Sequence, residues 1–124
     1  DFCPGIEVRN HEVYTGTIRT WLDDEGNVLR SEGHWEGVDN LYNPANPDVV
    51  LADKFALNTI YNARTGKNYV SGVSWRITIP GYGTAVVRTG RWYGAEYPDG
   101  HLAGKDSFLS PKDMEQFCSY LAGN

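Results

Sequence analysis

The chain has 124 residues, of which 11 are basic and 16 acidic, so its formal net charge is −5. This length suits one domain, and we expect a single domain over residues 1–124. A negative chain has the wrong sign to hold a phosphate backbone, so we expect no nucleic-acid partner. No stretch approaches the ~18 consecutive apolar residues that span a bilayer, so we expect no membrane insertion.

Strand patterns dominate residues 6–95, where β-branched and aromatic residues alternate with polar ones between glycine-bearing turns. The predicted strands cover residues 15–22, 27–41, 49–62, 68–79 and 84–95. Residues 96–109 read as an irregular stretch with a turn at residues 98–100 and one short strand. Hairpin order without alternating helices predicts a mainly β fold. We expect an antiparallel up-and-down β-barrel of about six to eight strands with one C-terminal helix. A two-sheet sandwich is the alternative.

The C-terminal segment carries the signals of a helix. Ser110 suits the N-cap, Pro111 the first helical position, and Gly123 the stop, which predicts a helix over 111–122. Its apolar residues recur at helical spacing and predict a stripe that lies on the sheet: Met114, Phe117, Cys118 and Leu121.

The two cysteines, Cys3 and Cys118, lie at opposite ends of the chain. Zinc ligands and redox pairs usually come as closely spaced couples, so this placement favours a disulfide that ties both ends to the domain. The alternative is two unrelated buried thiols in a cytosolic protein. A disulfide indicates a secreted or periplasmic protein, and we expect a bacterial exported one.

Alternation along each strand divides its residues between two faces of the sheet. The charged face of the second strand, predicted to meet solvent or to form a functional patch, holds Arg30, Glu32, His34 and Glu36. Its other face, predicted to point inward, holds Leu29, Ser31, Gly33, Trp35, Gly37 and Asp39. The other predicted inner rows are Phe55, Leu57, Thr59 and Tyr61; Tyr69, Ser71, Val73, Trp75, Ile77 and Ile79; and Thr84, Val86, Arg88, Gly90 and Trp92.

These rows predict an apolar cavity with a few polar anchors, as small-molecule sites commonly have. The candidate ligand-binding residues are Trp35, Tyr61, Trp75, Arg88 and Trp92. A buried Arg88 needs an anionic partner, which is either Asp39 or an anionic group on the ligand. The alternative is that the aromatic side chains simply fill the core.

The sequence gives weaker evidence for a catalytic or metal site than for a ligand cavity. If the protein is an enzyme, the titratable residues on the inner face are the candidate catalytic groups, namely Asp39, Tyr61 and Arg88. The histidines, His11, His34 and His101, match no defined ligand spacing, so we expect no metal site. Neither a phosphate-binding loop nor a Gly-x-Ser-x-Gly motif occurs, so we expect no cofactor and no serine-hydrolase site.

Two short segments, Gly33-His34-Trp35 and Gly90-Arg91-Trp92, resemble the Gly-x-Trp element of lipocalins. The resemblance implies a lipocalin-like or allene oxide cyclase-like exported barrel that holds a hydrophobic ligand. It also implies that Trp35 or Trp92 packs at the barrel base instead of contacting the ligand. The lipocalin element lies in the first strand, whereas Gly33 follows a complete strand.

Three functions remain open on this sequence. The favoured one is an exported barrel that binds a small hydrophobic or aromatic molecule, with or without an anionic group. The second is an enzyme that uses the same cavity for isomerase, cyclase, lyase or hydrolase chemistry. The third is a structural or protein-interaction module that exposes an apolar patch around Leu41 and Tyr42 or around residues 93–97.

Overall fold

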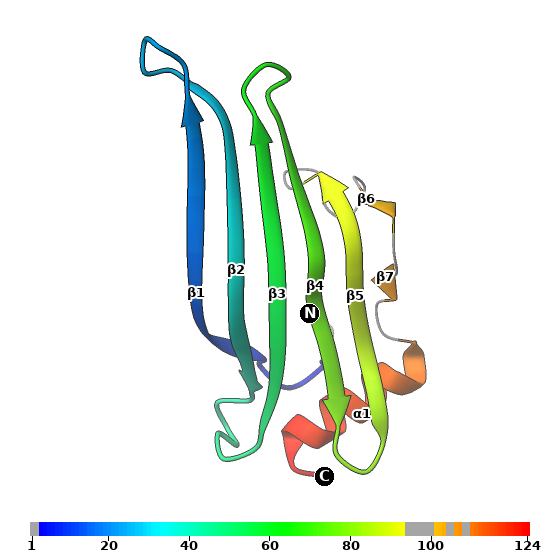
Figure 1. Cartoon of the computed structure of the whole chain (residues 1–124). Coiled ribbons are helices and arrows are strands. Elements are labelled where there is room, and N and C mark those ends of the chain that lie inside the picture. Colours follow the sequence, from blue (N-terminus) through cyan, green and yellow to red (C-terminus); the bar gives the residue numbers. More distant parts are fainter. Residues whose placement is uncertain (1–2, 94–100, 104–105, 108–109) are drawn as a thin grey trace.

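The computed structural model describes the backbone of residues 3–93, 101–103, 106–107 and 110–124, and the side chains of residues 3–93 and 110–124. Five long strands follow one another as hairpins (Figure 1): β1 (Arg9–Leu22), β2 (Val28–Tyr42), β3 (Val50–Asn62), β4 (Lys67–Ile79) and β5 (Gly83–Tyr93). Two short strands and a helix complete the described elements: β6 (His101–Ala103), β7 (Asp106–Ser107) and α1 (Pro111–Ala122).

All described strands belong to one antiparallel sheet in the order β1-β2-β3-β4-β5-β6, with β7 also pairing with β5. The mainly β prediction is therefore confirmed, but the described sheet is not closed into a barrel, and it is not divided into a sandwich. Closure requires strands of matched length at the two edges. Here one edge is the 14-residue β1, and the other carries only the three-residue β6 and the two-residue β7.

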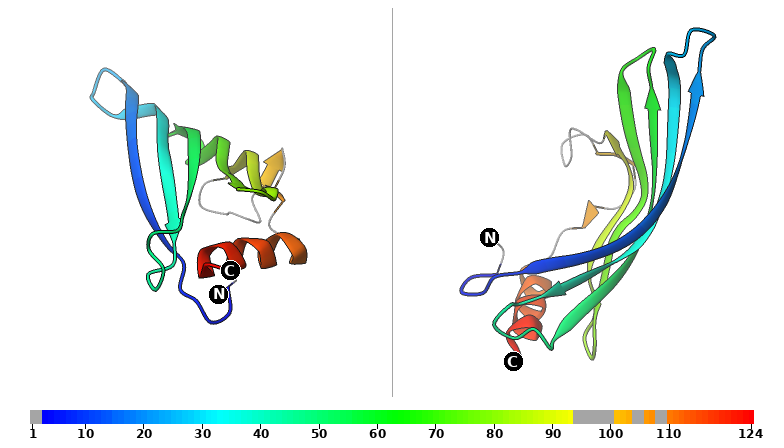
Figure 2. Two further views of the ribbon diagram at one scale, coloured as in Figure 1. Left: turned by 90° about the horizontal axis from the view of Figure 1, so that it is seen from below. Right: turned by 90° about the vertical axis from the view of Figure 1, so that its left-hand side faces the viewer.

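The sheet is strongly curved, and α1 lies on its concave side (Figure 2). Burial is concentrated at one end, called here the base, where the β2–β3 and β4–β5 turns lie. The base core comprises Leu41, Leu51, Ile77, Ile79, Val86, Phe117 and Leu121, all at most 5% exposed. Removal of this apolar surface from water supplies the main stabilisation of the fold.

Helix α1 has the predicted bounds, and its caps explain them. The Ser110 hydroxyl accepts a hydrogen bond from the Asp113 amide at 3.2 Å, and Gly123 adopts the left-handed conformation with φ +84°. Cys118 on this helix forms the predicted disulfide with Cys3. A closed loop of ~100 residues gives on the order of 4 to 5 kcal/mol in the chain-entropy model.

The face predictions hold for β2 and β3 but fail along part of β4. The register between β4 and β5 shifts between Val73 and Trp75, so one extra residue, Ser74, inverts the alternation. Tyr69, Ser71 and Val73 therefore lie on the convex face, whereas Trp75, Ile77 and Ile79 lie on the concave face.

A second irregularity corrects Thr84. The register shifts again between Ile77 and Thr78, which brings Thr84 opposite Thr78, with 3.3 Å between their hydroxyl oxygens. Thr84 is thus on the convex face, away from Val86 and Arg88. The strand β1 also begins six residues before the predicted start at Thr15. Residues 94–100, which include the end of the fifth predicted strand, lie outside the described part of the chain.

Candidate functional site on the concave face

The pairing register arranges the concave face into rows that cross the sheet. The middle row, called here the glycine row, crosses five strands and consists of Gly16, Trp35, Leu57, Gly72 and Gly90. Three of its five residues are glycines. The next row lies toward the β1–β2 and β3–β4 turns, called here the free hairpin ends. It consists of Ile18, Gly33, Thr59, Val70 and Trp92. An aromatic side chain in this region can therefore lie flat along the sheet.

Trp35 does so, and two glycines make room for it. A Cβ atom on Gly16 would lie 2.2 Å from the Trp35 ring, and one on Gly33 would lie 2.6 Å from its Nε1. The indole Nε1 donates a hydrogen bond to Thr59 Oγ1 at 3.2 Å. Tyr14 meets the ring edge-on, with 6.1 Å between centroids. We call this half-exposed arrangement the Trp35 platform.

A second aromatic cluster lies on the concave face of β4 and β5. The Arg88 guanidinium is 5.7 Å from the Trp75 ring centre and 5.8 Å from the Trp92 ring centre, within range of a cation–π interaction with each. Trp92 is buried, and the other two are half-buried. The backbone of β7 places Asp106 opposite Arg88.

Leu57 and two glycines follow Trp35 along the glycine row toward this second cluster. Gly72 and Gly90 are directly opposite one another, and each has φ +123°, a conformation that residues with side chains rarely adopt. An added Cβ on Gly72 would also lie 2.3 Å from the Ala56 carbonyl oxygen. The sheet therefore carries no side chain at two positions of this row, beyond Leu57.

Three carboxyl groups cross the sheet between the base core and the Trp35 platform. Glu12, Asp39 and Asp53 are direct neighbours on β1, β2 and β3, and we call them the acidic row. Asp39 accepts a hydrogen bond from Asn10 Nδ2 at 2.8 Å. Asp53 Oδ1 accepts one from the Arg76 amide at 2.9 Å, at a level where β3 and β4 no longer pair directly.

Burial and the neighbouring Asp39 charge raise the pKa of two carboxyl groups in this row, Glu12 and Asp53. Asp39 is 4% exposed and Asp53 is 2% exposed. Desolvation, together with the neighbouring Asp39 charge, raises the pKa of Asp53 to about 6. Burial, followed by the charge of Asp39, also raises the pKa of Glu12.

The candidate ligand-binding and catalytic residues all lie on the concave face, but they do not form one cluster. They are Trp35, Asp39, Tyr61, Trp75, Arg88 and Trp92. Tyr61 is opposite Ser31, eight positions along β2 from Asp39, which corresponds to roughly 27 Å at ~3.4 Å per residue. Two strands, β3 and β4, separate Asp39 from Arg88. The three candidate catalytic residues, Asp39, Tyr61 and Arg88, are therefore not brought together.

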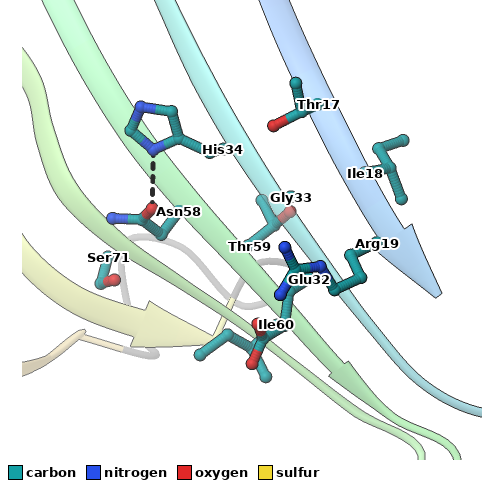
Figure 3. Close-up of a pocket in the computed structure, with 10 residues that line it drawn as sticks. All are labelled: Thr17, Ile18, Arg19, Glu32, Gly33, His34, Asn58, Thr59, Ile60 and Ser71. Carbon is teal, nitrogen blue, oxygen red and sulfur yellow. Dashed lines mark hydrogen bonds between the residues drawn. The ribbon is translucent and has the colours of Figure 1, made fainter. Parts of the chain in front are cut away.

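The convex face holds a polar groove of about 780 Å³ (Figure 3). Its lining comprises Thr17, Ile18, Arg19, Glu32, Gly33, His34, Asn58, Thr59, Ile60 and Ser71. His34 Nδ1 contacts Asn58 Oδ1 at 2.9 Å, and its Nε2 contacts Glu36 Oε1 at 2.9 Å. Hydrogen bonding to Asn58 and then to Glu36 raises the pKa of His34.

These contacts limit what the groove can do chemically. When both ring nitrogens of His34 donate to oxygen acceptors, neither can accept a proton from a nucleophile. Ser71 lies beside Asn58 and has no hydrogen bond to His34 (Figure 3). Within the described residues, no group of three or more His, Cys, Asp or Glu is arranged to hold a metal ion.

Sequence reasoning missed Asp53 and Gly16, which the structure shows to be central. Extension of the inner row of β3 by one alternation beyond Phe55 identifies Asp53 as inward-facing. The role of Gly16 depends on the register that brings it beside Trp35, and the local sequence carries no signal of that register.

The described helix is too short and too polar to span a membrane.

The comparisons with known proteins identify no relative. No protein-family model, curated protein or solved structure matches this chain.

Proposed function

We propose that this chain is an exported bacterial protein that binds a hydrophobic or aromatic small molecule against the concave face of its sheet. The observation that carries the proposal is the Trp35 platform: an indole laid flat over Gly16 and Gly33 and tied to Thr59. The disulfide between Cys3 and Cys118 supports export, because such bonds persist in oxidising compartments.

The geometry of the Trp35 platform suits ligand stacking. Its hydrogen bond and its glycine floor hold the half-exposed ring in place, so little conformational entropy is lost when a ligand stacks on it. The bare backbone at Gly72 and Gly90 leaves the part of the glycine row beyond Leu57 without side chains. A flat apolar molecule matches this combination of an aromatic wall and a side-chain-free floor.

Arg88 supports a preference for ligands with an anionic group. Its guanidinium lies on the same face, between Trp75 and Trp92, where a carboxylate or sulfonate would be favoured. In this proposal Trp35 contacts the ligand on an open sheet, which departs from the base-packing role that the lipocalin resemblance implies. The enzymatic alternative gains less support, because Asp39, Tyr61 and Arg88 are far apart.

Two fluorescent dyes test the proposal: the anionic 1-anilinonaphthalene-8-sulfonate and the neutral N-phenyl-1-naphthylamine. We expect saturable binding of both, and the Trp35→Ala variant should weaken both about tenfold. An aromatic contact contributes ~0.5–1.5 kcal/mol beyond its buried area, and 1.4 kcal/mol corresponds to a factor of about ten. The Arg88→Met variant should weaken only the anionic dye.

The matched control is Trp21→Ala, because Trp21 is exposed on the convex face beside Arg19 and Arg30. This variant should bind both dyes as the wild type does. All variants are first shown to unfold cooperatively, since partly unfolded chains also bind such dyes. Equal losses from Trp21→Ala and Trp35→Ala, or no loss from Trp35→Ala, would refute binding at the concave face.

A further inference from the structure

Strand β1 forms an edge of the sheet, and no other strand among the described residues pairs with its outer side. All 14 residues of β1 are exposed. Within the described part of the chain, β1 pairs only with β2. The right-hand view of Figure 2 looks onto this edge, where β1 runs uncovered from the base to its hairpin. Its outward amide and carbonyl groups are therefore available to another strand.

Natural edge strands are protected by proline, by lysine and other charged residues, by inward-pointing charges, by bulges or by covering segments. Among these features β1 carries an inward-pointing charge at Glu12 and two arginines, Arg9 and Arg19. The strand contains neither proline nor lysine, and its register with β2 is regular from Arg9 to Trp21. Large apolar side chains are exposed on it, including Tyr14 at 56% and Ile18 at 64%. The opposite edge differs, because β6 and β7 pair with β5.

We propose that β1 pairs antiparallel with β1 of a second copy of this chain, about a two-fold axis at Gly16. A two-fold axis perpendicular to the sheet keeps the concave faces of both copies on the same side. Directly opposed residues in an antiparallel pair lie on the same face of the sheet. One residue of β1 must therefore lie opposite its own copy, and the axis lies between these two copies. Gly16 and Thr15 are the two centres that use almost the whole strand.

Side-chain complementarity selects Gly16 over Thr15. With the axis at Gly16, Tyr14 of each copy lies opposite Ile18 of the other on the concave face. With the axis at Thr15, the carboxylate of Glu12 lies opposite the aliphatic side chain of Ile18. Apolar pairs directly opposite one another stabilise a sheet, and this pairing is gained only with the axis at Gly16.

The new ladder would form as many direct hydrogen bonds as a typical protein interface. Residues 10–22 of the two copies form roughly 12 backbone hydrogen bonds across the new ladder, compared with the ~10 direct hydrogen bonds of a typical protein interface.

The second copy also extends the concave face. The glycine row becomes continuous through Gly16 of both copies, and their Trp35 residues lie about 14 Å apart between Cα atoms, at three strand spacings of ~4.8 Å.

Sedimentation velocity tests the dimer on the chain with its disulfide intact. We expect the wild type to be dimeric, and Ile18→Lys should weaken the dimer at least tenfold, because it places an ammonium group opposite Tyr14 of the partner copy. The matched control is Val50→Lys, which changes another exposed aliphatic residue on the convex face of β3. It should leave the dimer unchanged.

Cysteine cross-linking tests the register. With the axis at Gly16, Thr15 opposes Thr17 of the other copy, so a mixture of Thr15→Cys and Thr17→Cys chains should form a mixed disulfide under mild oxidation. Thr15→Cys alone should not cross-link, because its two copies are then about 8 Å apart between Cα atoms, beyond disulfide reach. Both variants are checked for the native melting transition.

Three outcomes would overturn the proposal. One is a wild-type chain that remains monomeric at its highest soluble concentration. Another is a dimer that Ile18→Lys and Val50→Lys affect equally, because the interface then lies elsewhere. The third is efficient cross-linking of Thr15→Cys with itself, because the axis is then at Thr15 and the two Gly16 residues do not meet.

Discussion

The base of the molecule and its free hairpin ends are built from the same strands, yet they differ in burial. At the base, α1 covers the sheet, and Phe117 and Leu121 are at most 1% exposed. Toward the hairpin ends, Tyr14, Ile18 and Tyr61 are exposed on the same concave face. A curved sheet therefore buries one face only where a second layer reaches it. The base holds the buried core, and the free half leaves large aromatic and aliphatic side chains exposed.

The acidic row marks the boundary between these two halves. It lies directly between the Leu41–Leu51 pair of the base core and the Phe55 level of the Trp35 platform. The carboxyl groups of Asp39 and Asp53 are too buried to be fully hydrated, and they are direct neighbours. We infer that the boundary costs stability at neutral pH, and that the base core and the disulfide compensate for this cost.

The largest expected effect is the difference in stability loss between a substitution at the base and one in the free half. Phe117→Ala should lower the free energy of unfolding by about 3 to 5 kcal/mol, because it leaves a cavity in a closely packed core. Tyr61→Ala, at an exposed site of the free half outside the proposed dimer contact, should cost less than about 1 kcal/mol. Urea unfolding of both variants measures the difference. Similar losses would show that the free half is as tightly organised as the base.

An intermediate effect is expected at the boundary. The pKa of Asp53 is about 6 in the folded chain, above its ordinary value of 3.8. The folded state thus holds a proton that the unfolded state releases between these values, so stability falls as pH rises through this window and stays lower above it. The loss is on the order of 1 to 3 kcal/mol.

Asp53→Asn should remove this pH dependence and raise stability at pH above 6, since the amide oxygen can still accept the hydrogen bond from the Arg76 amide. Urea unfolding across the window compares the variant with the wild type. Asp24→Asn, in the exposed β1–β2 loop, is the control and should leave the wild-type profile unchanged. Parallel pH profiles for wild type and Asp53→Asn would contradict the role assigned to the acidic row.

The smallest effect concerns the Trp35 platform. Gly16→Ala forces the Trp35 ring to move, because the added Cβ would lie 2.2 Å from it. The ring is half-exposed and can shift, and alanine restricts the unfolded chain more than glycine does, so the net loss should be about 1 kcal/mol or less. Near-ultraviolet circular dichroism should nevertheless change clearly. An unchanged spectrum would show that the ring does not rest on Gly16.

Local sequence determined much of this protein. The helix 111–122 follows from Ser110, Pro111 and Gly123, whose effects act within one turn. The faces of β2 and β3 follow from strict alternation, which places Trp35 and Asp39 inward. The disulfide follows from the terminal positions of Cys3 and Cys118.

Tertiary structure alone decided the remaining features. The bulge at Ser74 inverts the face of Tyr69 and Ser71. The glycine at position 72 favours an irregularity in this strand, but the local sequence does not specify that Ser74 is the extra residue. The proximity of Asp39 to Asp53, and of Gly16 to Trp35, depends on register between strands that are distant in sequence. The open edge at β1 likewise depends on what pairs with the far side of the sheet. Alternation and capping act between near neighbours, whereas register and closure depend on the packing of the whole sheet, and this is the physical reason for the division.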